Sequence, residues 1–237
     1  MRGWRLMPSN LVLELFITMR KPDFEKARDY ALQRLERELF PQLYYHSLGH
    51  TRDEVVPAAE QLASNQGVAG MDFMLLVTGA YFHDIGYIQK MDDHEITSAR
   101  IASEALPGFG YSPEQIETIR GIILATKLPQ SPQTLLEEIM ADADLDVLGR
   151  DDFLKRSQDL RAELASLGIS NGDEAWYRSQ LEFLQAHHYF TPAAHQLRDE
   201  KKSKNIATLA RLLRQIQTNL VSREDDVADT GDFQNKR

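Results

Sequence analysis

Apolar residues recur every three or four positions along most of the chain, with polar residues between them. This spacing places the apolar side chains on one face of an α-helix. The first such stripe follows a capping residue, Asp23, and consists of Phe24, Ala27, Tyr30, Ala31, Leu35 and Leu39. No run of β-branched residues with a period of two persists. The pattern therefore predicts an all-α fold.

Further helices have recognisable starts. Ser112-Pro113-Glu114-Gln115 combines a Ser cap, a Pro at the first helical position and a Gln that closes a capping box. Ser131-Pro132 repeats this signal for a helix that we expect to end at Gly149. Another helix is expected to begin near Asp92 or Asp93, either of which can cap it. Amphipathic segments over 151–167, over 173–188 and from 191 onward complete a continuous series of helices.

The length of 237 residues fits one helical domain with a short appendage at each end. We expect an N-terminal extension over 1–22, a single domain over 23–221 and a disordered tail over 222–237, because the tail is polar. The apolar run over 11–19 follows a basic start, as in a signal peptide, but Glu14 interrupts it and no cleavage site follows. No other stretch approaches the length of a membrane span.

Composition limits the chemistry. The chain contains no cysteine, which excludes disulfides, thiolate metal sites and a cysteine nucleophile, and agrees with a cytoplasmic location. The net charge of −9 argues against binding long nucleic acids, although a local cluster around a metal can still attract a small anion. The sequence leaves open whether the chain forms a homo-oligomer.

One apolar stretch ends in chemically active residues. Residues 73–80 read as a buried helix, His83-Asp84 falls on its last turn, and Gly86 is expected to stop it. An imidazole and a carboxylate in a buried position are expensive unless a positive charge lies between them. Taken alone, this dipeptide is more often a capped helix end with a satisfied core histidine.

Two other segments offer donors for the same ion. His46 and His50 are four residues apart, which on a helix places both on one face. Asp142, Asp144 and Asp146 alternate in an otherwise apolar segment, and on a helix they cannot all face one way, since two residues turn the chain by about 200°. One of them is the expected ligand.

The order of His50, then His83-Asp84, then Asp144 on successive helices resembles the HD-domain superfamily of metal-dependent phosphohydrolases. The resemblance implies a helical bundle with a metal site in its core, held by these four residues. Two nitrogen and two oxygen donors suit one divalent transition metal, Mn, Fe, Co, Ni or Zn, better than Mg. Four protein ligands leave two octahedral positions for water or substrate.

Two narrower resemblances assign further roles. Tyr45-His46 followed by His50 is similar to the stretch of cyclic-nucleotide phosphodiesterases in which the first histidine protonates the leaving oxygen. The segment around Asp144 resembles their ligand segment, whereas members that read Ala-Asp-x-Leu favour Asp142. Dinuclear members carry more histidines between the His-Asp pair and the last aspartate. This chain offers only His94 there, and the resemblance therefore implies a single metal.

The resemblance implies hydrolysis of a small phosphate ester, with a nucleotide as the expected substrate, by attack of a metal-bound water. Asp84 would orient that water and His46 would act as the acid, whereas Lys127 and His94 are candidates for substrate binding. Lys127 as a surface lysine is an equal alternative. A non-catalytic nucleotide-binding module and a domain whose metal is purely structural are the competing functions.

The segment with His187 and His188, together with His195, resembles part of uncharacterised members and is a candidate lid. Histidines at a helix end also complement its dipole without any role in substrate binding. We therefore keep both interpretations for this segment.

Overall fold

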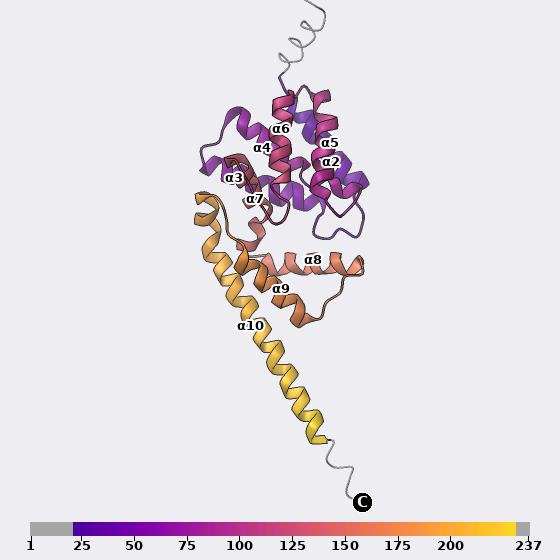
Figure 1. Cartoon of the computed structure of the whole chain (residues 1–237), viewed down its shortest axis with the longest axis vertical. Coiled ribbons are helices and arrows are strands. Elements are labelled where there is room, and N and C mark those ends of the chain that lie inside the picture. Colours follow the sequence, from indigo (N-terminus) through magenta and orange to yellow (C-terminus); the bar gives the residue numbers. More distant parts are fainter. Residues whose placement is uncertain (1–20, 231–237) are drawn as a thin grey trace, which may run out of the picture. The chain divides into compact units, whose positions relative to one another are not determined.

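The computed structural model describes residues 21–230, with side chains through residue 219. Every regular element in this range is helical, as the hydrophobic pattern predicts (Figure 1). The chain divides into two compact units, Met1–Leu145 and Asp146–Arg237. The prediction of one domain over 23–221 spans both units.

The N-terminal unit contains six α-helices within the described residues. They are α2 (Phe24–Glu38), α3 (Val56–Asn65), α4 (Gly70–Phe82), α5 (His94–Ala105), α6 (Pro113–Leu124) and α7 (Leu135–Asp144). Three short helical turns connect them, namely η1 (His50–Val55), η2 (Ile85–Ile88) and η3 (Leu106–Phe109). The first of these turns is a π-helix and the other two are 3-10 helices.

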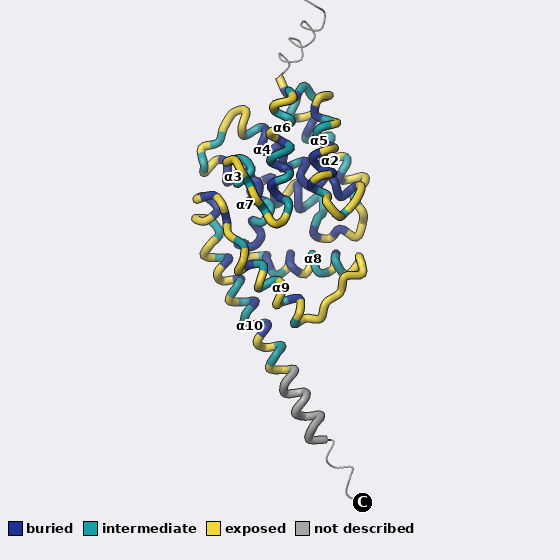
Figure 2. Tube along the Cα trace, viewed as in Figure 1, coloured by how far each residue is buried: buried dark blue, intermediate teal, exposed yellow. Residues whose placement is uncertain are grey.

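The core of this unit forms around α4, which packs against α2, α3, α6 and α7. The buried positions gather between these helices, as the dark blue segments of Figure 2 show. Large side chains that are almost fully buried, among them Leu76, Phe82, Ile122, Ile139 and Met140, fill this core. Burial of such a side chain stabilises a fold by about 1.5 to 3 kcal/mol, so the apolar stripes account for the bundle.

The predicted helix caps are confirmed at Asp23 and Ser112 and wrong at Ser131 and Asp93. Asp23 accepts a hydrogen bond from the Lys26 N–H at 3.2 Å, and Ser112 forms the expected capping box with Gln115. The cap of α7, in contrast, is Thr134 rather than Ser131, and α7 ends at Asp144 rather than Gly149.

The C-terminal unit consists of η4 (Asp146–Gly149), α8 (Phe153–Ser166), α9 (Asp173–Ala186) and α10 (Pro192–Thr230). Contacts of α10 with α9 and with η4 hold it together. Asn205 of α10 donates hydrogen bonds to the carbonyls of Leu148 and Arg150, at 2.9 and 3.0 Å. Helix α10 extends into the segment predicted as a disordered tail, while residues 1–20 and 231–237 lie outside the described residues. No helix among the described residues is long and apolar enough to span a membrane.

Candidate metal centre

His50 enters the site from the first turn after a bend in the chain. Its backbone N–H donates a hydrogen bond to the Ser47 hydroxyl at 3.3 Å, and helical structure begins at Leu48. His50 is therefore the first residue of the π-helix η1, and its side chain is 2% exposed. His46 lies in the preceding bend and not on this helix, so the predicted shared helical face is wrong.

His83 and Asp84 follow α4 directly, at the end of the most apolar helix of the unit. Both residues are buried, with 0% and 3% exposure. Gly86 serves a different purpose from the predicted helix stop, since it lies within the 3-10 turn η2 and its φ is not positive. A Cβ at this position would lie 2.1 Å from the carbonyl oxygen of His94. The glycine thus lets α5 approach the His-Asp turn.

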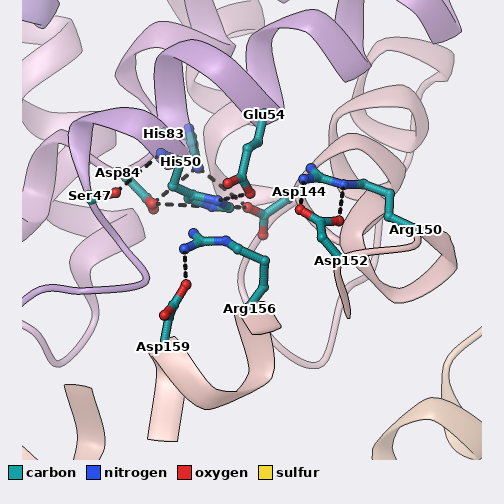
Figure 3. Close-up of polar contacts among 10 residues, drawn as sticks. All are labelled: Ser47, His50, Glu54, His83, Asp84, Asp144, Arg150, Asp152, Arg156 and Asp159. Carbon is teal, nitrogen blue, oxygen red and sulfur yellow. Dashed lines mark hydrogen bonds and ion pairs between the residues drawn. The ribbon is translucent and has the colours of Figure 1, made fainter. Parts of the chain in front are cut away.

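Asp144 ends α7 and brings its carboxylate to both histidines. Its Oδ1 lies 3.5 Å from Nε2 of His50 and 3.4 Å from Nε2 of His83. These three donor atoms lie within 4.8 Å of one another, and the group can hold a metal ion. Oδ2 of Asp84 lies 3.2 Å from Nε2 of His83 and 3.7 Å from Nε2 of His50. Figure 3 shows the four side chains pointing toward one another.

The convergent atoms are buried without a hydrogen bond. Nε2 of His50, Nε2 of His83 and Oδ2 of Asp84 all lack a hydrogen-bonding partner. Buried polar atoms without such a partner are costly, and two nitrogens and two carboxylates around one point form a donor set for a divalent transition metal. The residues present therefore fit the metal that the sequence predicts.

The orientation of the His83 ring is fixed by a contact on the side opposite the cluster. Its Nδ1 lies 2.8 Å from the backbone carbonyl of Ala80, in the last turns of α4. A carbonyl can only accept, so Nδ1 carries the hydrogen, and in the neutral ring Nε2 keeps its lone pair for a ligand. The neutral tautomer suited to metal binding is thus built into the helix end.

Electrostatics within the cluster favour proton sharing between imidazoles and carboxylates. Burial by itself lowers the pKa of His83, but the Asp84 and Asp144 carboxylates outweigh it and hold that pKa well above 6.5. Burial also lowers the pKa of His50, but the neighbouring carboxylates, above all that of Asp144, outweigh it and leave the pKa raised. Burial raises the pKa of Asp84, yet the neighbouring His83 holds it well below 3.8. A cation would replace the shared protons.

A second group of rings lies beside this cluster. Nε2 of His94 lies 3.4 Å from Oδ1 of Asp84, the oxygen that faces away from the other two histidines. The rings of His46 and His94 stack on Tyr87 with centroids 4.5 and 4.0 Å apart. The ring of His46 lies 5.9 Å from that of His50. The structure therefore brings His46 and His94 to the site, as the sequence predicts.

Lys127 points toward the start of α5. Its Nζ forms an ion pair with Oδ1 of Asp93 at 2.6 Å, and its side chain is 42% exposed. Asp93 precedes α5 with a left-handed φ of 51°, and its carboxylate does not cap the helix as expected. The role of Lys127 in holding a phosphate stays a prediction.

The alternative aspartates have other surroundings. Asp142 is fully buried and is not a member of the metal-capable group. Asp146 forms a bidentate ion pair with Arg198 within the C-terminal unit, so its carboxylate already has a cationic partner. The geometry therefore favours Asp144 among the three.

The later histidines belong to the C-terminal unit. His187 contacts Tyr189 edge to face at 4.7 Å, and Nδ1 of His195 pairs with Asp199 at 2.8 Å. His188 is exposed. Their predicted contact with a substrate stays a prediction.

Sequence reasoning missed the carboxylates behind the histidines. Oε2 of Glu54 lies 3.5 Å from Nδ1 of His50, and Oε2 of Glu95 lies 3.6 Å from Nδ1 of His94. The spacing of four residues between His50 and Glu54 is the signal that could have identified the first of them.

The fold and the donor set define the class of protein: a helical domain that can hold a metal through histidines and aspartates on separate helices. Comparison with known families agrees, because residues 43–146 match the HD domain. This part of the chain belongs to the HD-domain superfamily. No curated protein and no solved structure matched the chain.

Proposed function

We propose that the protein is a metal-dependent phosphohydrolase that acts on a small phosphate ester, with a nucleotide as the first substrate class to test. The observation that carries the proposal is the convergence of His50, His83, Asp84 and Asp144 on one buried point inside an HD domain. A divalent metal held at such a point would lower the pKa of a water molecule and polarise a phosphate oxygen.

Asp84 is suited to orient the attacking water. One of its oxygens faces His50 and His83, while the other faces His94 at 3.4 Å. Because the two oxygens of this carboxylate face different neighbours, one oxygen can accept a hydrogen bond from the water while the other stays in the cluster. Asp84 thus combines binding and orientation.

His46 is the proposed general acid. Its ring packs on Tyr87 and lies beside His50, but its residue is only partly buried, so a substrate can reach it. A protonated imidazole can donate its proton to a leaving oxygen. General acid catalysis of this kind contributes about 10²- to 10⁴-fold to the rate.

A non-catalytic binding module on the same fold is the second candidate. A sensor needs affinity for its ligand and no proton donor, so His46 beside the cluster favours hydrolysis. The two functions make different predictions for the same variants.

The experiment combines metal analysis with phosphate release from nucleoside mono-, di- and triphosphates and cyclic nucleotides. Mn, Co, Ni, Mg and Zn are added separately. We expect Asp84→Asn to lose metal and turnover, and His46→Ala to keep metal and lose turnover. Asp72→Asn, an exposed aspartate at the start of α4, is the matched control. Bound metal with nucleotide affinity and no turnover would favour the binding module, and failure to bind any metal would refute the proposal.

A further inference from the structure

We propose that Glu54 is a positioning residue that holds His50 in the orientation and tautomer required for metal binding. The inference rests on the proposed metal centre and assigns a role to a carboxylate outside the ligand set.

The two ring nitrogens of His50 face different partners. Nδ1 lies 3.5 Å from Oε2 of Glu54, while Nε2 lies 3.5 Å from Oδ1 of Asp144. The ring is 2% exposed, and the side chain of Glu54 is 18% exposed. Figure 3 shows Glu54 beside the His50 ring. Nδ1 is buried and forms no hydrogen bond in this structure, and the Glu54 carboxylate lies beside it. A small movement of the Glu54 side chain would let it accept the Nδ1 hydrogen and leave the Nε2 lone pair for the metal.

The local helix supports this pairing. His50 and Glu54 lie in the same π-helical turn, four residues apart. Residues at this spacing face each other one turn apart, and π-turns occur often at functional sites.

His83 is held by a hydrogen bond on its Nδ1 side. The partner there is the carbonyl of Ala80, a neutral backbone group at 2.8 Å. His50 begins its helical turn and faces a side-chain carboxylate instead. A carboxylate both orients an imidazole and makes it a stronger donor, and loss of such a partner typically costs about 10- to 100-fold in metal affinity.

The neighbouring Asp53 provides a matched control. It carries the same charge in the same turn, but it is exposed and pairs with Arg52 at 2.8 Å. Replacement of either residue by its amide removes one negative charge from η1. Only the change at position 54 alters the group that faces His50.

The test measures Zn²⁺ affinity of the full chain by competition with a chromophoric chelator. Long-range ¹H–¹⁵N spectra report the His50 tautomer in the Zn²⁺ form. We expect Glu54→Leu to bind Zn²⁺ about 10- to 100-fold more weakly. Glu54→Gln, which keeps an oxygen acceptor, should recover part of that loss, and Asp53→Asn should match the unsubstituted protein.

The outcomes separate the two proposals. If the unsubstituted protein binds Zn²⁺ and both Glu54 variants bind it equally well with an unchanged tautomer, Glu54 has no positioning role and the metal centre stands. If the unsubstituted protein binds no metal, the proposed function fails and this inference fails with it. If Glu54→Leu does not fold, the tautomer and affinity of Glu54→Gln decide the question.

Discussion

The close approach of α5 to the His-Asp turn gives a direct prediction for Gly86→Ala. The added Cβ would lie 2.1 Å from the carbonyl oxygen of His94 and 2.8 Å from the Ser98 hydroxyl. Ordinary contact begins near 3.4 Å, so the start of α5 must move away from the turn. The hydrogen bond from the Gly86 N–H to Ser98, at 2.7 Å, would be strained by the same movement.

The cost follows from the kind of atom that the methyl group meets. Overpacking of a core costs about 1 to 3 kcal/mol, and a backbone carbonyl cannot rotate away as a side chain can. We therefore expect a loss of about 3 kcal/mol in the free energy of unfolding, or roughly 6 to 12 °C in Tm. His94 should also move away from Asp84, from which Nε2 and Oδ1 are now 3.4 Å apart.

Urea unfolding followed by circular dichroism measures this loss. Gly108→Ala is the control, because a Cβ there meets nothing within 4 Å. We expect the control to unfold at the same urea concentration as the unsubstituted protein. A Gly86→Ala protein with unchanged stability would show that α5 does not approach the His-Asp turn as tightly as described.

Three further predictions concern charge. In equilibrium dialysis, Asp144→Asn should weaken Zn²⁺ binding by more than roughly tenfold. Asp142→Asn should lower the stability of the fold with little effect on Zn²⁺ affinity. The reverse result would make Asp142 the ligand. Zn²⁺ affinity should rise with pH above 6.5. Burial lowers the pKa of His83, but the neighbouring carboxylates outweigh it and raise that pKa, so the metal must displace the proton of His83. An affinity independent of pH between about pH 6 and 8 would contradict this. Burial, and after it the charge of Lys202, lowers the pKa of His187 to about 4. The unfolded chain therefore binds a proton at a pH at which the folded state does not, and the free energy of unfolding should fall as the pH drops from 6.5 toward 4. In urea unfolding, His187→Gln should reduce this pH-dependent loss of stability by about 1 to 2 kcal/mol, a small value because the ring is partly exposed. An identical pH dependence in both proteins would refute the role of His187.

The sequence was sufficient to predict the ligand candidates because burial makes them conspicuous. His83 and Asp84 end a helix that is otherwise apolar, and such a pair needs compensation. The helix pattern also placed His50 and Asp144 on separate elements. Their convergence followed only from the family resemblance, since hydrophobic periodicity does not say which helix ends meet.

Features that depend on packing between distant segments could not be predicted. The pairing of Lys127 with Asp93 requires the chain after α6 to reach the start of α5. The π-turn at His50 is equally hidden, because its residues have the spacing of an ordinary α-helix. Gly86 looked like a helix stop, although the approach of His94 is what requires it.

His50 and Asp144 are 94 residues apart in the sequence, with the His83-Asp84 pair between them. A metal ion shared by these residues would act as a cross-link that closes two long loops of the chain. The folded state would then gain stability with the logarithm of the free metal concentration. Helices α3, α4 and α7 would open together rather than one by one, and their amide hydrogens would exchange more slowly as a group. Metal supply would thus set the lifetime of the folded domain as well as its chemistry.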